Sequence, residues 1–168
     1  MKTKLRHLFT SAGLIALLSI ALLGSSTAAF ADQDDSANGP EGSWLYTVTI
    51  PDFGTFKGVE TYSAGGGYSE ADQLSFSPEA VASAGHGSWK NMGRGKFLMT
   101  YVNLTFDKFS TGAPTGTSKV RQIATIDKKG NSYSGSGDFN YFDTGGNPVF
   151  GGTFTITATR ILVEAPAH

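Results

Sequence analysis

His86 is the polar residue of this chain whose surroundings most favour chemistry. It lies in the run Gly85-His86-Gly87-Ser88-Trp89, where a glycine on each side leaves the imidazole accessible. An accessible imidazole can act as a general acid or base, or hold a ligand by hydrogen bonds. The alternative is a structural histidine that bonds backbone carbonyls and fixes its loop. The sequence shows no partner residue that would decide between these two roles.

Glu60 and Tyr101 are the other candidates for acid–base chemistry. In a strand, Glu60 shares a face with Tyr62, and Val59 and Thr61 share the opposite face. If the Glu60 face is internal, the carboxyl group is buried, its pKa is raised and it can serve as an acid or a base. Because buried glutamates are rare, we expect Val59 and Thr61 to face inward and Glu60 to be solvated.

Other catalytic classes lack the residues that they need. The chain has no cysteine, which excludes disulfides, thiolate metal sites and cysteine nucleophiles. Its other histidines, His7 and His168, lie at the two ends, so no metal site is expected. No Gly-x-Ser-x-Gly nucleophile motif occurs. We therefore predict no cofactor and lean towards a protein that is not an enzyme, with a haem held by His86 as the remaining cofactor alternative.

The elements that must position these residues are strands. Thr and aromatic residues are frequent, glycines fall at turn-like positions, and no long stretch has helical periodicity. Two D-x-x-G-N turns begin at Asp127 and Asp143. Eight strands in series predict an all-β fold, a single eight-stranded antiparallel up-and-down β-barrel over residues 42–164. The predicted strands are 44–50, 56–64, 68–74, 86–92, 96–107, 116–127, 132–143 and 149–164.

The longest connection, residues 75–85, interrupts this series. Ser77 is placed to cap one helical turn that begins at Pro78, because proline is favoured at the first helical position. The segment is either a lid over the barrel mouth or a plain surface loop.

Two residues predict how the barrel closes. Trp44 opens the first strand within Gly42-Ser43-Trp44, and Arg160 shares a face of the last strand with apolar residues. An inward arginine needs a partner, and stacking on the Trp44 indole supplies one. Arg160 exposed by fraying of the strand is the alternative.

Closure leaves an interior that a small apolar or amphipathic ligand can occupy. On the fifth strand both faces are apolar, so its outer face is either covered by the tail or loop, or forms a subunit interface of a homodimer. The side chains predicted to line the ligand site are mostly aromatic or aliphatic: Tyr46, Val48, Trp89, Phe97, Met99, Tyr101, Phe139, Tyr141, Phe154 and Ile156.

The first residues predict export. Lys2, Lys4 and Arg6 precede a short apolar run that ends near Ala29-Phe30-Ala31, so residues 1–31 read as a signal peptide. Residues 32–41 read as a disordered tail. Three of the 13 basic residues lie in the signal, which leaves ten against 14 acidic residues. We therefore expect a secreted or periplasmic domain that is mildly acidic. Its negative charge argues against nucleic acid as a partner, and we expect no membrane insertion after the signal is cleaved.

These features together resemble a known group of proteins. Gly42-x-Trp44, the run from Ser83 to Trp89, the two Asp turns and the closing Thr157-Ala158-Thr159-Arg160-Ile161 look like bacterial secreted lipocalin-like proteins of the calycin type, over residues 42–163. Allene oxide cyclase-like barrels are more distantly similar. The lipocalin resemblance implies that Gly42, Trp44 and Arg160 close the barrel. The cyclase resemblance implies a cofactor-free cyclase or isomerase as an alternative, and a pocketless interaction protein is the third possibility.

Overall fold

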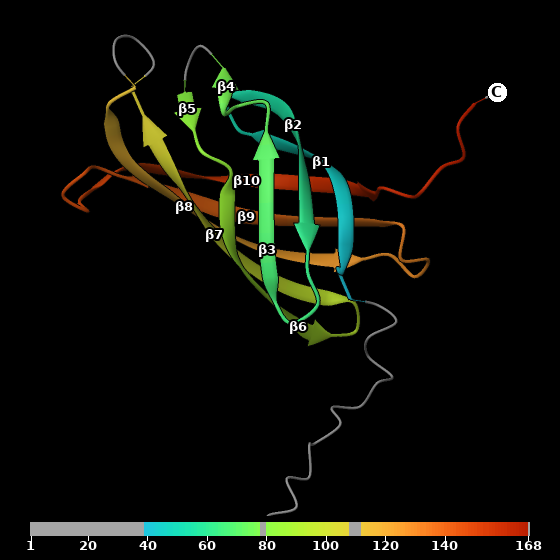
Figure 1. Ribbon diagram of the computed structural model, residues 1–168. Coiled ribbons are helices and arrows are strands. Elements are labelled where there is room, and N and C mark those ends of the chain that lie inside the picture. Colours follow the sequence, from blue (N-terminus) through green and yellow to red (C-terminus); the bar gives the residue numbers. More distant parts are fainter. Residues whose placement is uncertain (1–38, 78–79, 108–111, 168) are drawn as a thin grey trace, which may run out of the picture. The chain divides into compact units, whose positions relative to one another are not determined.

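Eight strands of this chain close into a β-barrel (Figure 1). The computed structural model describes residues 39–77, 80–107 and 112–167, so the expected signal peptide and most of the expected tail lie outside the described residues. The barrel strands are β1 (Gly42–Ile50), β2 (Gly54–Tyr62), β3 (Gly67–Asp72), β6 (Gly85–Gly93), β7 (Lys96–Phe106), β8 (Pro114–Ile126), β9 (Ser132–Phe142) and β10 (Pro148–Arg160).

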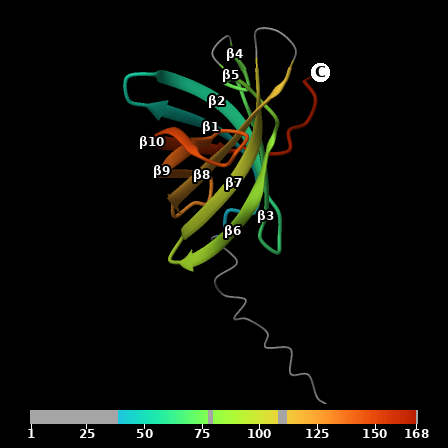
Figure 2. The same ribbon diagram turned by 90° about the vertical axis from the view of Figure 1, so that its left-hand side faces the viewer.

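The barrel has the predicted up-and-down topology. Each strand pairs antiparallel with the next barrel strand along the chain, and β1 pairs with β10 to complete the ring. The two views of Figures 1 and 2 show the strands wrapping around one interior. The last strand ends at Arg160 rather than at the predicted residue 164, and Leu162 is exposed beyond it. Among the described residues, no helix is long and apolar enough to cross a membrane.

The long connection folds differently from the sequence prediction. Strands β4 (Phe76–Ser77) and β5 (Ala80–Ala82) form a small antiparallel pair. Pro78, at which the predicted helical turn begins, lies outside the described residues, but Ala80 and Val81 within that turn are in a strand. β5 also pairs with β7, through Val81 opposite Phe106. The β7 backbone extends beyond β6 and offers free hydrogen-bonding groups, which a strand can satisfy and a single helical turn cannot.

Alternation along the strands sorts side chains between interior and solvent. On β8 the residues Val120, Gln122, Ala124 and Ile126 are buried, as predicted, while Arg121 is exposed. The two apolar faces of β7 also separate. Its inner residues include Phe97, Met99 and Tyr101, whereas Leu98, Val102 and Leu104 are 39%, 39% and 53% exposed. The homodimer predicted from that outer face stays a prediction.

The expected contact between Trp44 and Arg160 is present. The two residues pair across β1 and β10, and the guanidinium carbon lies 4.1 Å from the indole ring centroid. Arg160 Nε also donates a hydrogen bond to the Gly130 carbonyl at 2.7 Å, and Trp44 Nε1 donates to the Pro40 carbonyl at 2.7 Å. Residues 39–41, which the sequence assigned to a disordered tail, are therefore bound against one end of the barrel.

Candidate ligand-binding cavity

A cavity of about 690 Å³, including open solvent at its mouth, lies inside the barrel. Its walls are mainly aromatic and aliphatic, which is typical of small-molecule sites in proteins. Eight of the ten residues predicted to bind a ligand line it: Tyr46, Val48, Met99, Tyr101, Phe139, Tyr141, Phe154 and Ile156.

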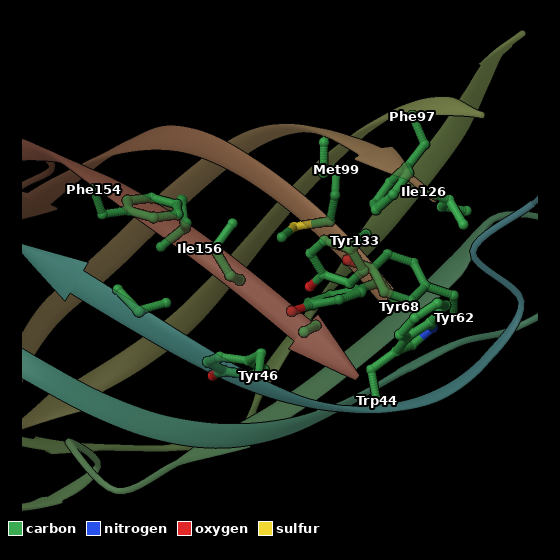
Figure 3. Packing of buried hydrophobic residues seen from close by; sticks show 14 residues of the cluster. Trp44, Tyr46, Tyr62, Tyr68, Phe97, Met99, Ile126, Tyr133, Phe154 and Ile156 are labelled. Carbon is green, nitrogen blue, oxygen red and sulfur yellow. The ribbon is translucent and has the colours of Figure 1, made fainter. Parts of the chain in front are cut away.

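One end of the barrel is filled by side chains. Trp44, Tyr62 and Phe97 are almost completely buried there, and their rings pack edge to face with neighbouring aromatics, including Tyr133. Figure 3 shows this aromatic group at one end of the core, with Phe154 towards the other end. The cavity therefore extends away from the Trp44–Arg160 end.

The opposite end of the cavity meets an apolar rim. Ile50, Leu74, Phe139 and Tyr141 line both the cavity and a groove beside it. Phe150 stacks on Tyr141 in this groove, with ring centroids 4.5 Å apart, and is 57% exposed. An apolar group that leaves the cavity at this end would meet aromatic surface before water.

The connection between β3 and β6 contributes to this open end. Ser75 and Ala82 line the cavity beside Leu74. Ser75 is held by Asp72, whose Oδ1 accepts hydrogen bonds from the Ser75 backbone N–H at 2.8 Å and from its hydroxyl at 2.9 Å. These contacts place Ser75 at the cavity wall, and the lid over the barrel mouth stays a prediction.

Glu60 is buried, and the prediction that it is solvated was wrong. Its side chain is 2% exposed, and it lines the cavity. Tyr62 and Tyr68 donate hydrogen bonds to its Oε2 at 3.2 and 2.9 Å, and Tyr133 donates to its Oε1. These three hydroxyls compensate for lost hydration, which is how a buried glutamate is accommodated here. Burial raises the Glu60 pKa to about 7, although the tyrosine hydrogen bonds act to lower it.

A second buried carboxyl group, Glu70, was missed by the sequence interpretation. Glu70 is 4% exposed, and Tyr46 donates a hydrogen bond to its Oε2 at 2.9 Å. The Tyr46 hydroxyl also lies 3.5 Å from Oδ2 of Asp72. Burial and the neighbouring Asp72 charge raise the Glu70 pKa to about 7, while Tyr46 and the Gly85 backbone lower it. The alternation of Tyr68, Glu70 and Asp72 on one face was the signal that could have revealed it.

Polar groups also occur on the β7–β8 side of the cavity. Asn103 and Ser118 are buried, line the cavity and are hydrogen-bonded to each other. Gln122 lines it as well and is 4% exposed. Its side chain lies near enough to Tyr133 to act to lower the pKa of that hydroxyl, but its Nε2 makes no hydrogen bond of good geometry with the described residues. A buried donor without a well-formed hydrogen bond costs free energy, so an acceptor brought to this position would be favourable.

Three predicted residues lie away from the cavity. His86 is exposed on β6, where it pairs with Ser69 and Val102 on the neighbouring strands, so it is not brought together with Glu60 and Tyr101. Trp89 donates a hydrogen bond from Nε1 to the Ser63 carbonyl at 2.9 Å. Phe97 belongs to the aromatic packing of the filled end. Tyr101 does line the cavity, as Glu60 does.

The described part of the chain contains no group of three or more His, Cys, Asp or Glu residues arranged to hold a metal ion. No model of a known protein family matches the chain, and no curated protein matches it either. The resemblance to lipocalin-like and allene oxide cyclase-like proteins therefore stays a prediction from the sequence.

Proposed function

We propose that this protein is an exported barrel that binds a small apolar or amphipathic molecule in its interior. The observation that carries this proposal is the internal cavity, whose apolar walls surround a few buried polar groups. Such a combination is typical of small-molecule sites, where apolar surface supplies affinity and placed polar groups fix orientation. Export rests on the signal-like residues 1–31 of the sequence.

The cavity favours a ligand with both polar and apolar parts. Val48, Phe154 and Ile156 offer apolar surface, whereas Glu60 and Gln122 place polar atoms in the same cavity. A purely apolar ligand would leave the Gln122 donor without a well-formed hydrogen bond. An amphipathic ligand can bury its apolar part and bring an acceptor to Gln122.

Native mass spectrometry of the full chain purified from its own host tests whether a ligand is bound. We expect a co-purifying small molecule that is lost on denaturation. A clean unliganded mass, together with no mass shift across a panel of lipids and isoprenoids, would refute the proposal.

Two substitutions on β8 locate the site. Val120 faces the cavity, whereas Ile123 is 47% exposed on the outer face of the same strand. Val120→Trp should fill the interior and abolish binding, and the matched control Ile123→Trp should bind normally. Overpacking at Val120 is expected to cost about 1–3 kcal/mol of stability, so folding is checked by near-ultraviolet circular dichroism. Equal binding by both variants would place the ligand elsewhere.

A second function, a cofactor-free isomerase, is favoured by one observation. Glu60 lines the cavity and its pKa of about 7 suits proton transfer in either direction near neutral pH. An isomerisation conserves mass but changes chromatographic retention. The co-purified molecule is therefore incubated with the wild-type chain and with Glu60→Gln. A retention change with the wild type alone would support catalysis, and an unchanged molecule in both samples would count against it.

A further inference from the structure

Three of the four acidic residues on the described barrel strands face the interior, whereas the fourth, Asp138, is paired with Arg121 on the outer face. Glu60, Glu70 and Asp72 face the interior, where the two glutamates are 2% and 4% exposed and Asp72 lines the cavity. The basic residues that are exposed on the outer face are Lys57, Lys90, Lys96, Lys119 and Arg121. Of the basic residues on the described barrel strands, Arg160 alone faces inward, and it is engaged by Trp44 and by backbone carbonyls at the filled end.

This arrangement determines which ligand charge the interior accepts. An anionic ligand would bring a further negative charge towards three acidic residues in a site of low dielectric constant. A cationic ligand would instead provide the positive charge that these carboxyl groups lack. Tyr62, Tyr68 and Tyr133 stabilise Glu60 by hydrogen bonds, but hydroxyl groups carry no compensating charge.

Two buried polar atoms have unused hydrogen-bonding capacity beside this acidic group. Oε1 of Glu70 makes no hydrogen bond of acceptable geometry with any described residue, although the Gly85 backbone lies close enough to lower the Glu70 pKa. Nε2 of Gln122, on the cavity wall, also makes no hydrogen bond of good geometry with the described residues, although the Gln122 side chain lies near enough to Tyr133 to act to lower the pKa of that hydroxyl. Because native proteins pair most buried polar atoms, a polar group of a ligand would improve the hydrogen bonding at these positions.

Aromatic rings complete the surroundings of the acidic group. Tyr46, Tyr68 and Tyr101 line the cavity, and the rings of Tyr68 and Tyr101 stack with centroids 5.3 Å apart. The faces of such rings attract cations, and this attraction is stronger where water is excluded.

We propose that the cavity binds a small protonated amine with an apolar body, whose ammonium group lies beside Asp72, Glu70 and Tyr46. This inference rests on the proposed ligand-binding function and names the class of ligand. The ammonium group donates hydrogen bonds to the carboxyl oxygens, and the apolar body packs against Val48, Phe154 and Ile156. The Gln122 amide is then available to a second polar atom of the ligand.

Three probes of similar size and different charge test the proposal. Titration calorimetry of the full chain at pH 7 compares 2-phenylethylamine, 2-phenylethanol and phenylacetate, which are cationic, neutral and anionic at that pH. We expect the amine to bind at least tenfold more tightly than the alcohol, a difference of about 1.4 kcal/mol, and phenylacetate to bind more weakly than both. Equal affinities for amine and alcohol, or a preference for phenylacetate, would overturn the amine class while leaving ligand binding intact. Absence of binding by all three probes would overturn the amine proposal. The native mass spectrometry described above would then show separately whether the protein binds a small molecule at all.

Isosteric substitutions test the position of the ammonium group. Asp72→Asn and Glu70→Gln keep side-chain volume and should each lower the amine affinity by about tenfold, while the alcohol affinity stays within about twofold. Asp138→Asn is the matched control, because it removes the same charge from a carboxylate paired with Arg121 on the outer face. An equal loss in Asp138→Asn, or no loss in the interior variants, would show that the cavity carboxyl groups do not select the cation.

Discussion

Tyr133 on β9 donates a hydrogen bond to Glu60 on β2, although 73 positions separate the two residues in the chain. Strands β1 and β10 lie between β2 and β9 in the sheet, so this bond crosses the interior instead of following the sheet. Tyr68 on β3 donates to the same carboxyl group, and Figure 3 shows the Tyr68 and Tyr133 side chains converging in the core. The Tyr133–Glu60 hydrogen bond therefore depends on the pairing of β1 with β10.

Buried Glu60 should make stability fall as the pH rises from 4.5 to 7. Its pKa is about 7 in the folded chain and 4.5 as the ordinary value, so the folded chain holds this proton more tightly. The stabilisation is complete below pH 4.5 and is lost by the time the pH exceeds 7, a change on the order of 3 kcal/mol. Urea unfolding across this range measures it, and Glu60→Gln should reduce the slope.

The Glu60 experiment has an internal comparison. The Glu70 pKa is also raised to about 7, so Glu70→Gln should reduce the slope in the same direction. Asp127 and Asp143 have lowered pKa values, so their contribution to stability increases as the pH rises. That increase occurs at a pH near and below 3.8, the ordinary pKa of aspartate, and therefore outside the range measured for Glu60. A Glu60→Gln variant with the wild-type slope would show that the buried carboxyl group does not titrate as described.

Replacing Gln122 should separate stability from binding. Gln122→Met keeps a similar volume and removes the buried Nε2, which makes no hydrogen bond of good geometry with the described residues although its side chain lies near Tyr133. We expect the unliganded chain to gain about 1 kcal/mol of stability, because the desolvation cost of that donor disappears. Ligand affinity should fall in the same variant. Thermal unfolding with and without ligand measures both effects, and a destabilised variant would indicate that Gln122 is already satisfied.

Trp44 should dominate the stability of the filled end. Trp44→Ala removes a side chain that is 0% exposed and should cost about 3–5 kcal/mol. Trp44→Phe keeps an aromatic ring for Arg160 but loses the hydrogen bond to Pro40, so it should retain more stability than Trp44→Ala. Denaturant unfolding gives both values. Nearly unchanged stability in Trp44→Ala would contradict this role.

The turn at Asp127 should depend on a single carboxyl oxygen. Oδ1 of Asp127 accepts hydrogen bonds from the backbone N–H groups of Asn131 and Ser132 at 2.9 and 3.1 Å. Asp127→Ala should therefore speed amide hydrogen exchange at these two positions. The equivalent amides after Asp143, at Gly145 and Asn147, should keep their protection and serve as the control. Unchanged exchange at Asn131 would mean that the turn does not need the carboxylate.

Sequence reasoning predicted the parts of the fold that depend on local alternation. Val120, Gln122, Ala124 and Ile126 could be placed inward because Lys119 and Arg121 on the same strand had to reach water. Sequence reasoning did not predict β5, because this strand is fixed by pairing with β7, which comes later in the chain. Such pairing is not encoded in the local pattern.

The buried carboxyl groups were missed for a related reason. Glutamate is rarely buried, and the hydroxyls that make burial possible for Glu60 come partly from distant positions. Glu70 depends on Tyr46, which lies 24 positions earlier. His86 was overvalued because flanking glycines indicate accessibility, and accessibility on an outer face does not place a side chain in a cavity.

The contacts of Gly39 and Pro40 with the Trp44–Arg160 end have a practical consequence for biosensor design. β10 finishes at the same end, so the chain enters and leaves the described barrel away from the cavity mouth. An affinity handle or a surface tether attached ahead of residue 39 would leave the opening unobstructed. Immobilised copies would then present their openings to the flowing analyte.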